Sequence, residues 1–303
     1  MLPKKYNFVR EIVSELWDGD PESLILVRES ANVVFRFQSN DVDYFLRITN
    51  IWKREKVVSA MSYLRYVHGK GAPVYEPIAS MNGRYIEDYD HHNSTYMCRV
   101  YAAVAGKVLT NRCDDPVIYT AWGKAIAQLH EAAITYKPSP KLYFWSHDEE
   151  VEETVEFLPP KDAVAWREYE AVMGWFESKP AIDGGFGVTH GDCNAGNFVW
   201  NGRTITIIDF DEPMWEWYAA DVARPFLEIL DFPLELRRAL MAAFVAGYRE
   251  IRPLDDFTVA SLPWFIRFKN LAIYAWELGD NDTPYNHPDM IELRELFANP
   301  VKW

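Results

Sequence analysis

The sequence predicts an α+β fold in which a β-rich N-terminal part precedes a larger, mainly helical part. Runs of β-forming residues dominate residues 1–101, whereas apolar residues recur at helical spacing through most of residues 102–303. The chain has 303 residues, 49% of them hydrophobic and 25% charged, which is a globular composition and long enough for two lobes. Because the strands precede the helices and do not alternate with them, α+β is favoured over α/β.

The N-terminal part is expected to contain an antiparallel sheet and one helix. Strands are predicted at residues 24–27, 33–37, 44–48, 95–101 and a short segment reaching 78. Apolar residues from Val57 to Val67 recur at helical spacing, and Gly69 or Gly71 would end that helix. We place the boundary of this lobe after residue 101.

The C-terminal part is expected to be helical, apart from a few strands. Asp115 and Pro116 are typical of an N-cap and a first helical position. The helix that they begin is followed by helices predicted at residues 164–176, 221–230, 234–248, 259–276 and 290–297. Strands are predicted at residues 188–190, 198–200 and 204–208, the last two joined by the Asn201-Gly202 turn.

Charge and cysteine content disfavour several classes of protein. The net charge is −14, from 31 basic and 45 acidic residues, which disfavours a nucleic-acid partner and suits a cationic substrate, although plain solubility is the favoured explanation of the charge. Cys98, Cys113 and Cys193 lack the spacing of disulfide or zinc sites. The start does not resemble a signal peptide, and no apolar run reaches about 18 residues. We therefore expect a cytoplasmic protein that does not span a membrane; its oligomeric state is not predicted.

The pattern His190-x-Asp192-x-x-x-x-Asn197, followed by an apolar strand ending in Asp209, indicates phosphoryl transfer. That reaction has a loose transition state, so the protein mainly positions groups and neutralises charge. Asp192 could meet the acceptor hydroxyl, while Asn197 and Asp209 offer the hard oxygen ligands that Mg²⁺ prefers. The Asn201-Gly202 turn would bring Asp209 back beside Asn197. A zinc site built from His190, Asp192 and His130 is the alternative, which the small number of His and Cys residues disfavours.

The segment 188–223 resembles the signature of the aminoglycoside phosphotransferase and choline kinase superfamily, whose members have a protein-kinase-like fold. Further similarities cover nearly the whole chain, at residues 30–36, 44–48, 71–78, 127–130 and 221–223. The resemblance implies a protein-kinase-like, two-lobe fold. It also implies an enzyme that uses ATP, or GTP, and Mg²⁺ to phosphorylate a hydroxyl group of a small molecule such as an aminoglycoside, an amino alcohol or a sugar.

The resemblance implies roles for the residues of the central motif. Asp192 would be the catalytic base or the group that orients the hydroxyl, and His190 would brace the catalytic loop. Asn197 and Asp209 would be Mg²⁺ ligands. Asp221 would be a structural carboxylate that supports the loop.

The resemblance also implies a nucleotide site in the N-terminal lobe. Arg47 would contact the α- and β-phosphates, and the hairpin that carries Ser30 and Asn32 would cover the nucleotide. Backbone groups of the connection from Val100 to Ala103 would meet the adenine.

The N-terminal lobe departs from the family pattern in two places. Arg47 stands where many members have lysine; arginine keeps the charge and can bind phosphate bidentately, but it is not equivalent. On the helix that supplies a glutamate partner in the family, Ala60 occupies the expected position and Glu55 is the remaining candidate. These departures motivate a different class of function, a nucleotide-binding regulatory module with little turnover. Asp192 argues against it, because a pure binder needs no base.

Acidic and aromatic residues follow the predicted metal ligand and recur near the C-terminus. The candidate acceptor contacts are Asp211, Glu212, Trp215, Glu216, Trp276 and Asp280. Acids attract amines, and aromatic faces bind cations or stack on sugar rings. For a single tryptophan the alternative is core packing, and for a single acid it is a solvated surface; Asp211 could instead contribute to the metal. We expect a small hydroxyl acceptor with amine or sugar character. A protein kinase is disfavoured by the short segment between Asp211 and Asp221, which leaves little room for a peptide platform.

Overall fold

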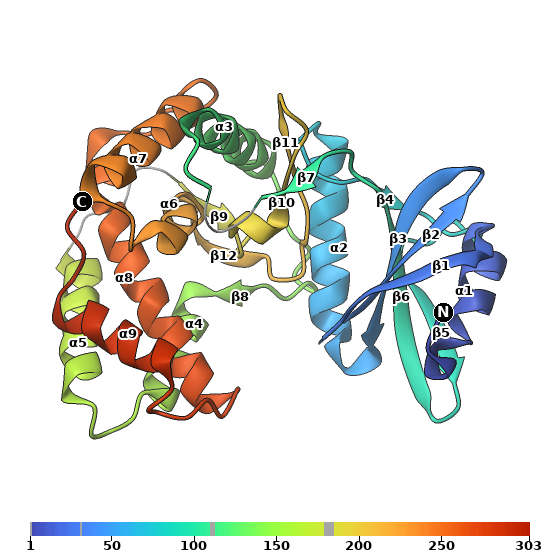
Figure 1. Ribbon diagram of the computed structural model, residues 1–303, viewed down its shortest axis with the longest axis horizontal. Helices are drawn as coiled ribbons and strands as arrows, with labels where there is room; N and C mark the ends of the chain where they lie inside the picture. The colour runs from blue at the N-terminus through green and yellow to red at the C-terminus, as the bar shows by residue number, and fades with distance from the viewer. Residues whose placement is uncertain (1, 31, 110–112, 179–184) are drawn as a thin grey trace.

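The computed structural model describes residues 2–30, 32–109, 113–178 and 185–303, and it has a β-sheet part and a helical part (Figure 1). Helix α2 (Arg54–Gly69) lies between the two parts in Figure 1. It contacts the helical part directly, since the Tyr63 hydroxyl donates to the Val188 carbonyl at 2.8 Å. This architecture confirms the α+β class predicted from the sequence.

The N-terminal part is built on a six-stranded antiparallel sheet. Its main strands, in spatial order, are β1 (Asp20–Glu29), β2 (Val33–Ser39), β3 (Val42–Asn50), β6 (Ser94–Ala102) and β4 (Pro77–Ile78). Strand β5 (Glu87–His91) also pairs with β6. The register of β3 against β6 sets Arg47 directly opposite Arg99. Two arginines therefore stand side by side within the sheet.

A second helix in this part was not expected from the sequence. Helix α1 (Val9–Trp17) buries Val9, Ile12, Val13 and Trp17, whose spacing puts them on one face. These residues pack in one apolar cluster with the buried sheet residues Phe35, Phe37 and Leu46. The prediction of a single helix in this lobe was thus wrong: α1 covers one face of the sheet, and α2 lies between the sheet and the helical part (Figure 1).

The C-terminal part contains the remaining helices of the described chain. They are α3 (Pro116–Ala133), α4 (His147–Phe157), α5 (Ala163–Ser178), α6 (Tyr218–Ala223), α7 (Leu234–Arg249), α8 (Asp256–Gly279) and α9 (Pro288–Ala298). As predicted, Asp115 caps α3 by accepting from the Val117 amide. Helices α3 and α7 approach closely at glycines; a Cβ on Gly247 would lie 1.9 Å from the Thr120 carbonyl oxygen. No helix in the described ranges is long and apolar enough to span a membrane.

Two small sheets within the helical part position the central motif. One contains β7 (Lys107–Val108), β10 (Phe198–Trp200) and β11 (Ile205–Ile207), and the other contains β8 (Trp145–Ser146), β9 (Phe186–Val188) and β12 (Met214–Trp217). The predicted catalytic segment runs from the end of β9 to the start of β10. The predicted metal-binding Asp209 follows β11, and the Ile208 amide donates to the Asn197 carbonyl at 2.9 Å. The hairpin therefore returns this segment to the catalytic loop.

Candidate active site

The catalytic loop is joined to the segment after β11 by a buried histidine. The Nε2 atom of His190 lies 3.0 Å from the Ile208 carbonyl oxygen, and its Nδ1 atom accepts from the Asp192 amide at 3.3 Å. A carbonyl oxygen can only accept, so the proton of a neutral ring is on Nε2. His190 thus fixes the backbone of Asp192 relative to the residue that precedes Asp209.

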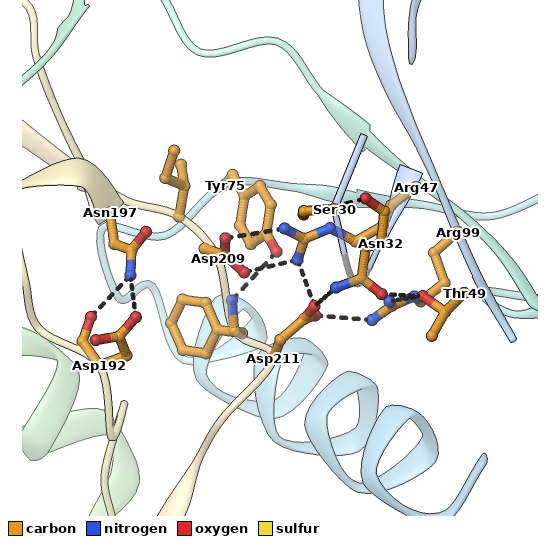
Figure 2. A network of polar contacts seen from close by, with 12 residues as sticks. Ser30, Asn32, Arg47, Thr49, Tyr75, Arg99, Asp192, Asn197, Asp209 and Asp211 are labelled. Carbon is orange, nitrogen blue, oxygen red and sulfur yellow. Dashed lines mark hydrogen bonds and ion pairs between the residues drawn. The ribbon is translucent and has the colours of Figure 1, made fainter. Parts of the chain in front are cut away.

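The Asp192 side chain is held by an amide and a guanidinium group. Asn197 Nδ2 donates to Asp192 Oδ2 at 2.9 Å and to the Asp192 carbonyl at 2.8 Å (Figure 2). Arg224 Nη2 lies 2.9 Å from Asp192 Oδ1. Burial by itself would raise the pKa of Asp192, but the charge and hydrogen bond of Arg224 outweigh it and lower the pKa to about 2. Asp192 is therefore ionised at neutral pH.

The buried carboxylate of Asp221 supports the catalytic loop through hydrogen bonds to its backbone. Asp221 accepts from the amides of His190 at 2.7 Å and Gly191 at 3.0 Å, and its Oδ2 lies 3.1 Å from His130 Nε2. Burial lowers the pKa of His130 despite the opposing hydrogen bond to Asp221, so the ring is neutral and donates through Nε2. Its Nδ1 then accepts from the Tyr248 hydroxyl at 2.9 Å. Because His130 and His190 are both engaged in this way, the zinc alternative is wrong.

Gly191 is required by a close approach of two segments. Its φ is +80°, and a Cβ atom there would lie 1.9 Å from the Glu212 carbonyl oxygen. Asp209 also has a positive φ, of 62°, which is unusual for a residue other than glycine. The catalytic loop and the segment after β11 are therefore packed backbone to backbone.

Arg47 of β3 reaches across to both aspartates after β11 (Figure 2). Its Nη1 and Nη2 atoms donate to Asp209 Oδ1 at 2.6 Å and Oδ2 at 2.8 Å, a bidentate pair. Nη1 also lies 2.8 Å from Asp211 Oδ2. The carboxylate partners of Arg47 are thus Asp209 and Asp211, and the suggested pairing with Glu55 is wrong, because Glu55 is exposed in the first turn of α2.

Asp211 is the centre of a second set of contacts. It accepts from Arg99 Nη1 at 3.0 Å and from Asn32 Nδ2 at 2.7 Å. The Thr49 hydroxyl connects the two donors, accepting from Arg99 Nη2 and donating to Asn32 Oδ1, each at 2.7 Å. Burial alone would raise the pKa of Asp211, but Arg99 and Arg47 outweigh it and lower the pKa. The alternative of a solvated surface acid is therefore wrong for Asp211.

The other predicted nucleotide contacts lie at the edge of this network. Ser30 is exposed at the end of β1, and its amide donates to the Asn32 carbonyl at 3.0 Å; residue 31 lies outside the described ranges. Val100 is buried in β6 between β3 and β4, so its backbone faces strands on both sides. Ala103 is exposed just after β6, and its amide donates to the Asp43 carbonyl at 3.1 Å.

Two of the predicted acceptor contacts, Trp215 and Glu216, are neighbours on strand β12, so their side chains point to opposite faces of the strand. Glu216 is buried and accepts from the Thr189 hydroxyl at 2.8 Å, whereas Trp215 points to the opposite face and is exposed. Trp215 and Glu216 therefore lie in different surroundings, and contact of either residue with an acceptor stays a prediction. Trp276 and Asp280 are exposed towards the end of α8, and Glu212 lies 3.4 Å from Lys56.

A small cavity lies beneath the catalytic loop. Its volume is about 20 Å³, which is room for about one water molecule. Gly191, Arg224 and Glu216 line it together with residues of α4 and α8, among them Glu150 and Lys269, which form an ion pair. Burial, reinforced by the charges of Asp221 and Glu150, raises the pKa of Glu216 to about 8.

Several residues of the site were missed from the sequence. Arg224 lies beyond the central motif, and nothing in the sequence indicates that it contacts Asp192. The contact depends on the position of the 3₁₀ helix (Arg224–Ile229) beside the catalytic loop. Arg99 and Thr49 lie on strands that were predicted, but only the register of the sheet shows that they meet. Tyr75, whose hydroxyl accepts from the Phe210 amide at 3.4 Å, was likewise not identified.

Comparison with known proteins identifies the family. The profile of the phosphotransferase enzyme family matches residues 25–257, which include the sheet network, the catalytic loop and both aspartates after β11. The chain belongs to this phosphotransferase family. Membership confirms the prediction of a phosphotransferase and the resemblance on which it rested. Amicoumacin kinase of Bacillus subtilis is 24% identical over 284 residues, which cover 89% of this chain and 81% of that protein.

Solved structures of other phosphotransferases share the fold. The amicoumacin kinase hAmiN, in complex with AMP-PNP, Ca²⁺ and Ami, matches with a TM-score of 0.84 and 21% identity, covering 99% of this chain and 95% of that chain. A microcompartment-associated aminopropanol kinase matches with a TM-score of 0.76 and 19% identity, covering 96% of this chain and 94% of that chain. These likenesses confirm the predicted two-lobe, kinase-like fold of this phosphotransferase.

The raised pKa of Glu216 predicts a pH-dependent contribution to stability. A carboxyl whose pKa rises from 4.5 to about 8 on folding stabilises the protein fully below pH 4.5, and this stabilisation is lost as the pH rises through about 8. Glutamine does not titrate, so in Glu216→Gln position 216 causes no loss of stability as the pH rises. We expect the free energy of unfolding of the variant, relative to wild type, to increase between about pH 5 and about pH 8 in urea titrations.

The matched control is Glu212→Gln, which replaces an exposed glutamate in the same segment. A difference between Glu216→Gln and wild type that stays constant over this pH range would contradict the burial of an uncharged Glu216.

Proposed function

We propose that this phosphotransferase moves the γ-phosphoryl group of ATP to a hydroxyl group of a small molecule. The observation that carries the proposal is the position of Asp192: an ionised carboxylate, held by Asn197 and Arg224, in a loop braced by His190 and Asp221. Amicoumacin kinase and aminopropanol kinase, whose names describe small-molecule kinases, support this choice of acceptor class.

Asn197 and Asp209 are the residues that would hold Mg²⁺. The side-chain amide nitrogen of Asn197 donates to Asp192, which leaves its amide oxygen for a cation. Asp209 offers a carboxylate and directly follows Ile208, whose backbone amide is bonded to the Asn197 carbonyl. Hard oxygen donors of this kind fit Mg²⁺. When bound, Mg²⁺ would neutralise the charge of the transferring phosphates.

Asp192 would orient the acceptor hydroxyl and take its proton as the phosphoryl group is transferred. Its pKa of about 2 makes it a weak base, which suits a loose transition state in which the proton moves late. Arg224 balances its charge. The Nε and Nη1 atoms of Arg224 are buried without a hydrogen-bond partner in the part of the chain that the structure describes, beside a cavity with room for about one water molecule.

The nucleotide would bind between the two lobes, residues 1–101 and 102–303. Arg47 would contact the phosphates beneath the hairpin of Ser30 and Asn32. Ala103, just after β6, would contact the adenine, because the backbone of Val100 faces strands on both sides. We propose ATP over GTP, since the related hAmiN structure contains AMP-PNP. The free thiols of Cys98 and Cys193 fit a reducing cytoplasm.

The acceptor is proposed to carry a positive charge. Carboxylates gather where α4 meets the end of α8: burial, together with the charges of Asp280 and Glu150, raises the pKa of Glu153. Glu150 also lines the cavity under the catalytic loop, as does Gly191, the residue before Asp192. Acids that repel one another are stabilised by a bound cation, so an amine on the acceptor would be attracted here.

Asp192→Asn and Asp209→Asn separate chemistry from metal binding. Asp192→Asn should lower kcat by about 10²- to 10⁴-fold and leave the affinity for Mg-ATP within a fewfold, because the hydroxyl loses its base. Asp209→Asn should instead weaken ATP binding only when Mg²⁺ is present. ADP release and calorimetric titration with and without Mg²⁺ measure both.

Nucleotide binding by wild type without ADP release for any acceptor would favour a regulatory module. Loss of turnover and nucleotide binding together in Asp192→Asn would contradict the role proposed for Asp192.

Matched acceptors test the charge preference. An amino alcohol and its uncharged diol, or an aminoglycoside and a neutral sugar, are compared by ADP release, with Asp192→Asn as the blank. The cationic member should have a kcat/KM about tenfold higher or more, which corresponds to roughly 1.4 kcal/mol of attraction. Equal or faster reaction of the neutral members would contradict a cationic acceptor.

A further inference from the structure

Two buried arginines face each other at the centre of the N-terminal sheet. Arg47 on β3 and Arg99 on β6 are directly paired in the register, and their side chains are 11% and 1% exposed. Like charges directly opposite one another on neighbouring strands destabilise a sheet, and burial increases that cost. The pair therefore depends on carboxylates that lie close to both guanidinium groups.

The two carboxylates that neutralise the arginines have different partners. Asp209 is bonded in this network to Arg47, and it is also the residue proposed to hold Mg²⁺. Asp211 contacts both arginines, at 2.8 Å from Arg47 and 3.0 Å from Arg99, and it accepts from Asn32 at 2.7 Å as well. When Asp209 turns to a metal, the contact that still fixes Arg47 is the one to Asp211.

Helix α2 has no carboxylate that could do this. Its sequence from Arg54 to Gly69 contains one acid, Glu55, which is exposed in the first turn. Ala60 is buried and has no charge to offer. The partner of Arg47 must therefore come from outside α2.

We propose that Asp211 is the residue that positions Arg47 for the nucleotide phosphates, in place of a carboxylate on α2. Arg99 and Asn32 hold Asp211, and Thr49 holds both of them, so the Asp211 carboxylate stays in place whether or not Asp209 binds metal. Asp211 is on this account a positioning residue and contacts neither metal nor acceptor. The inference rests on the proposed function in one respect, that Arg47 binds phosphate.

This arrangement couples the alignment of Arg47 to the approach of the two lobes. Arg47, Arg99 and Asn32 belong to the N-terminal sheet, whereas Asp211 follows β11 of the C-terminal part (Figure 2). The phosphate-binding arginine is therefore fully held only when the lobes are together.

A double-mutant cycle tests the inference through nucleotide binding. The Kd for Mg-AMP-PNP is measured by calorimetry for wild type, Asp211→Asn, Arg47→Gln and the double variant, with titration into the millimolar range for the weak binders. We expect Asp211→Asn to weaken binding by roughly tenfold in the wild-type background and by less than about twofold when Arg47 is already Gln. A purely structural defect would weaken both backgrounds alike.

Thr49→Val provides a milder variant in case Asp211→Asn does not fold. Thr49 is 2% exposed, so it cannot touch the nucleotide, and valine removes only the hydroxyl that supports Arg99 and Asn32. It should weaken Mg-AMP-PNP binding by a smaller factor, again only when Arg47 is present. The control is Glu168→Gln, which breaks a buried pair with Arg267 in the helical part and should leave the Kd unchanged.

The alternatives give different results. If Asp211 were a metal ligand, its substitution would weaken binding equally in the Arg47→Gln background, and the inference would be overturned. Unchanged affinity in Asp211→Asn would overturn it as well. Absence of Mg-AMP-PNP binding to wild type would instead contradict the proposed function, independently of Asp211.

Discussion

The charge balance at the centre of the N-terminal sheet is the constraint on which the rest of this structure depends. The register of β3 against β6 brings Arg47 and Arg99 together, and an unpaired buried charge costs several kcal/mol. Both compensating carboxylates, Asp209 and Asp211, come from the C-terminal part. The same contacts therefore stabilise the sheet, join the lobes and place an arginine beside the residues proposed to bind Mg²⁺ and phosphate.

A second buried carboxylate plays the corresponding role in the helical part. Asp221 accepts two amides of the catalytic loop and the ring of His130, which in turn accepts from Tyr248 on α7. Because buried polar groups are costly when unpaired, this chain of bonds allows the loop few other conformations. The Asp192 side chain is thus held before any ligand binds, and such preorganisation favours phosphoryl transfer.

Much of the fold could be predicted from the sequence because it depends on local patterns. Clear periodicity or caps predict strands β2, β3 and β10 and helices α2, α3 and α7. The spacing of His190, Asp192 and Asn197 identifies the catalytic loop. The predicted elements do not include helix α1, although its apolar residues share one face. They do not include strand β12 either, and the alternation that separates Trp215 from Glu216 follows only from that strand.

The partners of the site residues could not be predicted, because they depend on register and packing between distant segments. Nothing in the local sequence of Asp211 indicates that it meets Arg99, and nothing near Arg224 indicates that it meets Asp192. The alanine at position 60 gave a signal, since it left Arg47 without the glutamate partner expected there. The roles of Asp192, Asn197 and Asp209 in catalysis and metal binding stay predictions.

Thermal unfolding with nucleotide tests the central claim, that the contacts around Asp209 form a Mg-nucleotide site. Wild-type protein is heated with ATP, with GTP and with neither, each in the presence and absence of Mg²⁺. At about 100 times the dissociation constant, ATP with Mg²⁺ should stabilise the protein by about 2.7 kcal/mol, and omission of Mg²⁺ should remove most of the shift. An unfolding temperature that neither nucleotide changes, with or without Mg²⁺, would contradict the account.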